Sequence, residues 1–396
     1  MRILAIHNYH RSGSASGDDQ VFRAETSLLE KHGNEVLRYT VCNDEFDRSG
    51  PIGKVLKTLG MAWSVKHYKG VTRAIASFRP DIVHVHTFFP LLSPSILYAA
   101  KRSGVPVVAT LHDTRFVCPV ATSLRDGNIC NECGDGCYLR MARHACFKGS
   151  RAQSLWVAAV FMFHRLRRTF YEQIDRYICL NDQQISLLKD VGFSPEKIVK
   201  KYNFVEDTLG DTGDVSEGLP NRYVVFYGRI GEEKGVRVLM DAWETLPDVP
   251  LVVMGGGPLE NEFATWATGR ENVHYLGYTP RDRCLAIVRG AAVVVFPSIW
   301  YEGCSMVEIE TESLGRAIIA SDLGFSAEAV KDGVNGLKFP VNNYKALAET
   351  VRNAWDSPTL IQEMGNGARL DYIRNYLPET NYEQLISIYQ KTIDDE

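Results

Sequence analysis

The chain has 396 residues, more than one hydrophobic core normally serves, so we expect two domains. Hydrophobic residues make up 45% and charged residues 23%, a composition that excludes disordered, collagen-like and coiled-coil proteins. The formal net charge of −4 conceals two segments, 49–80 and 136–171, that contain Lys and Arg but no Asp or Glu. The longest apolar run, residues 155–163, is about half the length that a membrane-spanning helix needs.

Strand-like and helix-like patterns alternate through the first half of the chain. Apolar, β-rich runs cover residues 2–9, 35–41, 81–87 and 106–113, and a helical pattern covers about 20–32. This alternation indicates βαβ units and a parallel sheet. A stretch rich in Cys and Gly interrupts it at about 116–149, and strands return at 176–182 and 198–205. We therefore expect residues 1–205 to form a Rossmann-like domain with a Cys-rich insertion.

The second half repeats the same alternation after a break. Residues 206–220 are acidic and Gly-rich with few apolar side chains, as in a surface linker. Strand-like runs then follow at 222–230, 249–257, 273–278, 291–298, 316–324 and 336–340. This pattern predicts a second doubly wound parallel sheet. Such sheets bind ligands beyond the carboxyl ends of their strands, so we expect a site in a cleft between the two domains.

Two carboxylates, Glu302 and Glu310, follow the strand at 291–298, the first in a loop and the second in a helix. Eight residues at helical rise span roughly 12 Å, which suits one carboxylate on a sugar and the other on a ribose across a diphosphate. Carboxylates grip hydroxyl pairs well, and the start of the helix can hold phosphate. The alternative is that the acidic residues 308–312 form a solvated face of the helix.

A second cluster supports the nucleotide-sugar interpretation. Gly228, Arg229 and Lys234 directly follow the strand at 222–230 and lead into a helix, an arrangement that favours a diphosphate and stabilises charge on a leaving group. An exposed surface turn is the alternative. A further tight turn, Met254 to Gly257, follows the next strand at the same edge.

Together these residues resemble the retaining glycosyltransferases of family 4. The resemblance covers nearly the whole chain and implies the α/β GT-B fold, with two facing Rossmann-like domains, 1–205 for the acceptor and 206–378 for the nucleotide sugar. It also implies that a C-terminal helix, 379–396, crosses back to the first domain. In this family Glu302 would contact the donor sugar, Glu310 the ribose, and Arg229 and Lys234 the diphosphate.

The resemblance assigns further residues less directly. Gly17 corresponds to a glycine-rich loop of the family, although one of its usual two glycines is replaced, and His112 matches a histidine near the donor sugar. His84 is expected to be structural. Gly228 and Gly257 belong to the predicted donor site. The sugar pocket would be lined by Gly303, which keeps the usual family pattern, and by Cys304, Ser305, Met306 and Val307, which depart from it. No Asp-x-Asp motif occurs, so we expect catalysis to need no metal.

Five cysteines fall within 29 residues of the insertion. The spacing of Cys130, Cys133, Cys137 and Cys146 fits tetrahedral coordination of a structural zinc ion, which could order a loop that has few apolar residues. Disulfides, free thiols and an iron–sulfur cluster are the alternatives.

The two acid-free segments resemble helices that lie on anionic membranes, although a core helix with a solvated basic face is an equal alternative. No nucleic-acid-binding motif accompanies the charge. We expect a cytoplasmic enzyme, bound peripherally to the inner face of the cell membrane, that moves a sugar from a UDP or GDP sugar to a saccharide or a polyprenyl-diphosphate-linked saccharide. A nucleotide-sugar 2-epimerase and a non-catalytic nucleotide-binding subunit are the alternatives.

Overall fold

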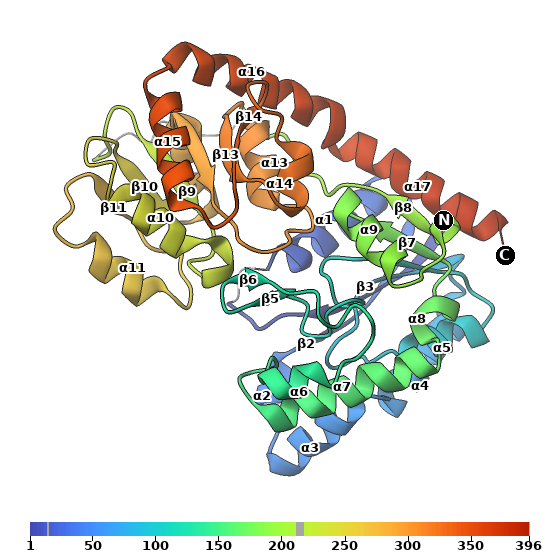
Figure 1. Ribbon diagram of the computed structural model, residues 1–396. Helices are drawn as coiled ribbons and strands as arrows, with labels where there is room; N and C mark the ends of the chain where they lie inside the picture. Colours follow the sequence, from blue (N-terminus) through green and yellow to red (C-terminus); the bar gives the residue numbers. More distant parts are fainter. Residues whose placement is uncertain (14–15, 211–217, 396) are drawn as a thin grey trace. The chain divides into compact units, whose positions relative to one another are not determined.

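The computed structural model describes residues 1–13, 16–210 and 218–395 (Figure 1). Its contacts divide the chain into two units. Unit 1 comprises Met1–Ser123, Cys130–Tyr202 and Asn381–Glu396, and unit 2 comprises Leu124–Ile129 and Asn203–Thr380. Near the expected domain ends, the chain passes from unit 1 to unit 2 after Tyr202 and returns to unit 1 after Thr380. Part of the predicted linker, residues 211–217, lies outside the described residues.

Unit 1 is built on a six-stranded parallel sheet of order β2-β1-β3-β4-β7-β8. The strands are β1 (Arg2–Tyr9), β2 (Glu35–Cys42), β3 (Ile82–Thr87), β4 (Val107–Thr110), β7 (Arg176–Cys179) and β8 (Ile198–Lys200). The central strands are apolar and buried on both faces, as strands covered by helices on both sides must be. The strand order reverses between β1 and β3, so the loop after β1 and the end of β3 flank a topological switch point.

Some helices of unit 1 begin at a residue whose side chain caps a free backbone N–H group. Helix α1 starts at Gly17, three residues before the expected start, because the Ser16 side chain caps it by accepting from the Asp19 N–H. The other helices are α2 (Asp44–Asp47), α3 (Pro51–Gly60), α4 (Val65–Phe78), α5 (Ser95–Arg102), α6 (Arg140–His144), α7 (Arg151–Leu166), α8 (Thr169–Glu172) and α9 (Asp182–Asp190), with α1 ending at Lys31 and a 3-10 turn at Pro195–Lys197.

The C-terminal helix α17 (Pro378–Asp394) lies mostly in unit 1. Its Leu385 and Tyr389 are completely buried and pack with Ile3, Ile82 and Ile178 of the sheet. The end of the chain is therefore part of the core of unit 1.

Unit 2 contains a second six-stranded parallel sheet, of order β11-β10-β9-β12-β13-β14. The strands are β9 (Val224–Tyr227), β10 (Leu251–Met254), β11 (Val273–Tyr275), β12 (Val293–Phe296), β13 (Ile318–Ser321) and β14 (Gly336–Phe339). The helices are η2 (Glu232–Lys234), α10 (Val236–Trp243), α11 (Glu260–Ala267), α12 (Arg281–Gly290), α13 (Met306–Ser313), α14 (Gly324–Ala329), α15 (Tyr344–Trp355) and α16 (Pro358–Asn375). Here the strand order reverses between β9 and β12, and both predicted donor motifs follow these two strands.

The Cys-rich segment lies between β4 and α7. It contains a small antiparallel hairpin of β5 (Leu124–Arg125) and β6 (Asn128–Ile129), followed by the short helix α6. Within the described part of the chain, no helix is long and apolar enough to cross a membrane.

Candidate active site

The loops after β9 and β12 touch at the switch point of unit 2. Gly235, with φ +67°, ends the turn that carries Lys234, and a Cβ atom there would lie 1.8 Å from the carbonyl oxygen of Pro297. Only glycine allows this approach, because any side chain would overlap the backbone of the facing loop. The sequence thus forces Lys234 close to the residues that follow β12.

Glu302 is 7% exposed and is held from several sides. Its Oε1 accepts hydrogen bonds from Lys234 Nζ at 2.6 Å, Ser298 Oγ at 2.7 Å and Trp300 Nε1 at 2.6 Å. The Lys234 ammonium also lies 5.6 Å from the centre of the Trp300 ring, within reach of a cation–π interaction. The predicted sugar-binding carboxylate and the predicted phosphate-binding cation therefore form one preorganised pair.

The other predicted phosphate ligand, Arg229, is less constrained. Its side chain is half exposed and lies 3.5 Å from the carboxylate of Glu233. The glycines around it bring neighbouring loops together. A Cβ on Gly255 would meet the Gly228 carbonyl oxygen at 1.8 Å, and one on Gly257 would meet the Ile230 carbonyl oxygen at 2.6 Å. The predicted turn after β10 is thus packed against the turn that carries Arg229.

Glu310 lies in α13 and is 6% exposed. Burial raises its pKa, while an ion pair with Arg281 at the start of α12 lowers it, and the net shift is upward. Glu308 and Glu312 are also buried, at 1% and 2% exposure. The alternative interpretation of this helix as a solvated acidic face is therefore wrong. The reason is that α13 packs against α12, α16 and β13, so that neighbouring elements cover its acidic side chains.

The segment between the two glutamates is held by the Ser305 side chain and by its backbone carbonyl groups. Ser305 caps α13 by accepting from the Glu308 N–H, and Cys304 is buried, with its carbonyl oxygen accepting from Asn203 Nδ2 at 3.1 Å. The Val307 carbonyl oxygen accepts from the Tyr227 hydroxyl at 2.7 Å. Gly303 and Met306 are partly exposed within the same loop.

In unit 1, the predicted residues lie near the other switch point. Gly17 is exposed at the start of α1, and His112 is partly buried just after β4. His112 Nε2 lies 2.9 Å from His86 Nδ1. Burial lowers the pKa of His112, and the nearby Asp18 only partly offsets this effect. His112 and His86 line a small pocket, together with Thr87, Asp113, Arg115 and Phe116.

Comparison with known families identifies the chain. Residues 25–209 match the model Glycosyltransferase Family 4, and residues 215–371 match the model Glycosyl transferases group 1. The chain belongs to the family-4 glycosyltransferases. This glycosyltransferase is 26% identical to the α-D-kanosaminyltransferase of Streptomyces kanamyceticus. The match covers 84% of this chain and 81% of that protein. It is also 31% identical to the D-rhamnosyltransferase WbpZ of Pseudomonas aeruginosa over 39% of this chain and 42% of that protein, so that match spans less than half of WbpZ.

Solved structures show the fold of this glycosyltransferase. Anabaena Alr3699/HepE in complex with UDP has a TM-score of 0.70 at 18% identity and covers 99% of this chain and 100% of that one. Sucrose-phosphate synthase from Thermosynechococcus elongatus has a TM-score of 0.72 at 18% identity, with 100% of both chains covered. The fold is therefore GT-B, as expected.

Two residues near the predicted site residues of this glycosyltransferase, Arg281 and Glu25, were not predicted from the sequence. Arg281 precedes Glu310 by 29 positions and belongs to no motif. In unit 1, Glu25 lies 3.1 Å from His86, which is in turn bonded to His112, and only the His-x-His pattern of β3 signals this. His84 is buried and bonded to Thr110, in keeping with its expected structural role.

The cysteines of this glycosyltransferase are arranged differently from the predicted zinc set. Burial, together with the thiols of Cys118, Cys146 and Cys130, raises the pKa of Cys133 to about 12. Cys137 is exposed and is not among these neighbours. Among the described residues, only Glu25, His84 and His86 place three potential ligand atoms within 4.8 Å of one another. Neither the four predicted thiols nor a set with Cys118 in place of Cys137 is gathered that closely.

Proposed function

We propose that this glycosyltransferase moves a hexosyl group from a UDP or GDP sugar to a hydroxyl group, with retention at the anomeric carbon. The observation that carries the proposal is the pairing of Lys234 with Glu302 at the switch point of unit 2, 2.6 Å apart. The donor class is supported by the related fold of Alr3699/HepE, whose solved complexes contain UDP, UDP with glucose, and UDP-glucose.

The pair suits a donor that is broken between its sugar and its diphosphate. An ammonium has three N–H donors, so Lys234 can keep its bond to Glu302 and still contact a phosphate oxygen. Its charge stabilises the diphosphate as negative charge builds on it, which lowers the barrier to cleavage of the glycosidic bond. Glu302 then accepts hydrogen bonds from the transferred sugar, and Glu310, held by Arg281, accepts them from the ribose.

No protein nucleophile is assigned in this proposal. The donor phosphate accepts the proton of the attacking hydroxyl, and the sugar is delivered on the face from which the diphosphate leaves, which gives retention. His112 binds a hydroxyl of the substrate. Cationic side chains replace a metal at the diphosphate, so we expect transfer to continue in the presence of a chelator.

Donor screening followed by product analysis tests this proposal. UDP and GDP sugars are first screened by thermal shift, and the anomeric configuration of the product is then read by NMR. Lys234→Ala should lower kcat/KM at least about tenfold, because a charge-assisted bond is lost, whereas Lys345→Ala, an exposed lysine in the same unit, should have no effect. Conversion of the donor alone would favour an epimerase, and an inverted product or unchanged Lys234→Ala kinetics would refute the proposal.

We further propose a lipid-linked saccharide as acceptor, presented at an anionic membrane. Helix α3 has no buried residue, although its apolar side chains recur at helical spacing. This apolar stripe faces solvent with exposures of 78%, 58%, 64% and 53% for Ile52, Val55, Leu56 and Leu59. Lys54 is exposed in the same helix, and Lys66 is exposed near the start of α4, both within the acid-free segment of the sequence. An interfacial helix has this combination of an apolar face and basic flanks.

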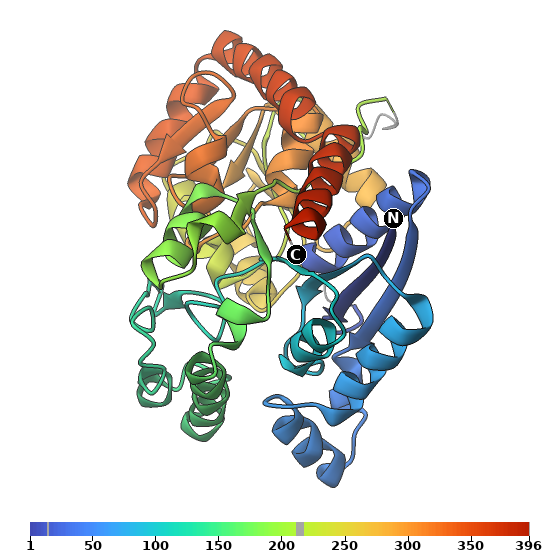
Figure 2. The same cartoon turned by 90° about the vertical axis from the view of Figure 1, so that its right-hand side faces the viewer.

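Helix α3 lies at the edge of unit 1 (Figures 1 and 2). Flotation with vesicles rich in phosphatidylglycerol tests the proposal. Leu56→Glu should abolish flotation at low salt, while Leu370→Glu, at the same 64% exposure in α16, should leave it intact. Equal flotation of both variants, or none by the wild type, would exclude the α3 surface.

We also propose that the insertion binds a structural zinc ion through Cys118, Cys130, Cys133 and Cys146, with Cys118 in place of Cys137. Cys118 is chosen because its thiol, with those of Cys130 and Cys146, acts on Cys133, whereas Cys137 does not. Burial raises the pKa of Cys118, and the backbone N–H groups of Ser123, Val120 and Thr122 offset this only in part. Metal analysis of the purified protein should find one zinc ion, lost in Cys118→Ser and kept in Cys137→Ser. Loss of zinc in both variants, or no zinc with every thiol titratable, would contradict this ligand set.

A further inference from the structure

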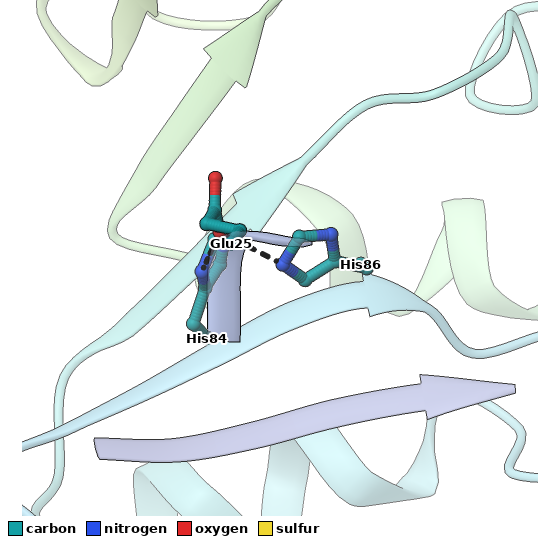
Figure 3. Close-up of side chains that lie close together, drawn as sticks. All are labelled: Glu25, His84 and His86. Atoms are coloured by element: carbon teal, nitrogen blue, oxygen red, sulfur yellow. Dashed lines mark ion pairs between the residues drawn. The ribbon is translucent and has the colours of Figure 1, made fainter. Parts of the chain in front are cut away.

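Behind the pocket that holds His112 lies a buried polar chain in the core of unit 1. Strand β3 carries His84 and His86 two residues apart, so both imidazoles point to the same face of the sheet. Helix α1 places Glu25 against that face. All three side chains are at most 6% exposed. Figure 3 shows the carboxylate between the two imidazole rings.

The distances link Glu25 to His112 through His86. Glu25 Oε1 lies 3.1 Å from His86 Nε2, and His86 Nδ1 lies 2.9 Å from His112 Nε2. The planes of the two imidazole rings are inclined by 20° and their centres lie 5.2 Å apart, which is compatible with an N–H···N bond between them. Neither Glu25 Oε1 nor His86 Nε2 makes a well-aligned hydrogen bond to a described residue. Glu25 Oε1 also lies 3.2 Å from His84 Nδ1, but the Tyr389 hydroxyl lies closer to that nitrogen, at 2.7 Å, which leaves His86 Nε2 as the nearest unsatisfied partner of Glu25 Oε1.

The charge state of Glu25 determines the direction of these bonds. Its second oxygen lies 3.0 Å from the ammonium of Lys201, which is itself buried and bonded to Asn381. Burial alone would raise the pKa of Glu25, but Lys201 and the two histidines hold it well below its usual range. Glu25 is thus an ionised carboxylate, which can only accept hydrogen bonds.

The tautomers follow one from the next. Because Glu25 only accepts, His86 must carry its proton on Nε2, and burial keeps this ring neutral by lowering its pKa. The Nδ1 atom of His86 then has a lone pair and accepts from His112 Nε2–H. A neutral His112 protonated on Nε2 has its own lone pair on Nδ1.

We propose that Glu25 and His86 are positioning residues that hold His112 in the Nε2–H tautomer, so that its Nδ1 accepts a hydrogen bond from a substrate hydroxyl. The proposal rests on the proposed role of His112 as a substrate ligand and deepens it. In this tautomer His112 Nδ1 binds a hydrogen-bond donor, such as a sugar hydroxyl. It repels a phosphate or carbonyl oxygen, whose lone pairs would face its own.

A metal ion held by Glu25, His84 and His86 is the competing use of these atoms. The surroundings oppose it. The Lys201 ammonium already neutralises Glu25, and the Tyr389 hydroxyl occupies His84 Nδ1 at 2.7 Å. A divalent cation placed beside a buried ammonium would face strong repulsion in this low-dielectric core.

The tautomer is directly measurable by NMR on full-length protein labelled with 15N-histidine. The chain has only ten histidines, and the signals of His112 are assigned by their loss in His112→Gln. We expect the Nε2–H form in the wild type and its loss in His86→Leu. His86→Gln should restore it, because its amide can donate to Glu25 and accept from His112. The Nδ1–H form in the wild type would overturn the proposal, and this spectrum needs no variant of His86.

Kinetics separate the proposal from the function on which it rests. His86→Leu should lower kcat/KM about tenfold, the loss of one aligned hydrogen bond, and His86→Gln should recover most of it. His164→Leu, which removes another buried histidine of unit 1, controls for general destabilisation and should keep the His112 tautomer. Full activity of His112→Gln, together with the expected Nε2–H form of His112 in the wild type, would refute only the role of His112 as a substrate ligand. Stoichiometric bound metal that is lost in His84→Gln would overturn the proposal that Glu25 and His86 position His112.

Discussion

Glu308 offers the sharpest test of the electrostatics around the donor site. It is 1% exposed, and neither of its carboxylate oxygens makes a well-aligned hydrogen bond to a described residue. Burial raises its pKa to about 8, with Ser326 lowering it and the nearby Glu302 raising it further. The native state therefore keeps Glu308 protonated at neutral pH, whereas the unfolded chain ionises it.

The sign and size of the effect follow from linkage. Between the unfolded value of 4.5 and the folded value of about 8, the folded state binds more protons, so the free energy of unfolding falls as pH rises. Below this window both states are protonated and the cost vanishes. At pH 7 the cost is about 3 kcal/mol, from about 1.4 kcal/mol for each pH unit above the unfolded pKa.

Glu308→Gln has a similar shape but cannot ionise, so it should escape this cost. Urea unfolding from about pH 5 to about pH 8 should show the variant gaining on the wild type by about 1.4 kcal/mol per pH unit. Glu349→Gln, an exposed glutamate of the same unit, should run parallel to the wild type. A difference between Glu308→Gln and the wild type that does not change with pH would refute the reasoning.

Two further substitutions test the construction of the site. Gly235→Ala should destabilise unit 2 by at least about 2 kcal/mol in thermal unfolding, because its Cβ would overlap the Pro297 carbonyl. Gly269→Ala, also at positive φ but with open space around it, should destabilise the unit by only about 1 kcal/mol. Equal losses of stability would show that backbone strain, and not the overlap with Pro297, acts at Gly235. Arg281→Gln should weaken the thermal stabilisation by UDP or GDP, because Glu310 loses the cation that orients it, and an unchanged shift would remove Arg281 from the site.

The fold was predictable because the βα alternation is strong in both halves of the chain. The spacing of apolar runs indicated parallel sheets, and the break after residue 205 suggested two domains. The order of the strands could not be derived in this way, because it depends on which crossover packs on which edge. The positions of Glu302 and Lys234 after their strands were evident, but their direct bond depends on the close approach of Gly235 to the facing loop.

The missed residues share a physical reason. Arg281 and Glu25 reach their partners through tertiary packing, and neither belongs to a local motif. Glu308 looked like part of a solvated helix because charged residues usually are, and only the packing of α13 shows it to be buried. Short cysteine spacing favoured Cys137 as a metal ligand, and this stays a prediction. Cys137 is exposed, whereas Cys118 is among the thiols that act on Cys133, a proximity that spacing alone does not indicate.

Nucleotide binding tests the proposed donor site without the sugar or the acceptor being known. Isothermal titration of UDP and of GDP should be carried out with the wild type, Lys234→Ala and Glu310→Gln. We predict that one of the two nucleotides binds the wild type and that each variant binds it at least about tenfold more weakly, through loss of a phosphate or a ribose contact. Equal affinity in all three proteins, or no binding of either nucleotide by the wild type, would contradict a donor site built on Lys234, Glu302 and Glu310.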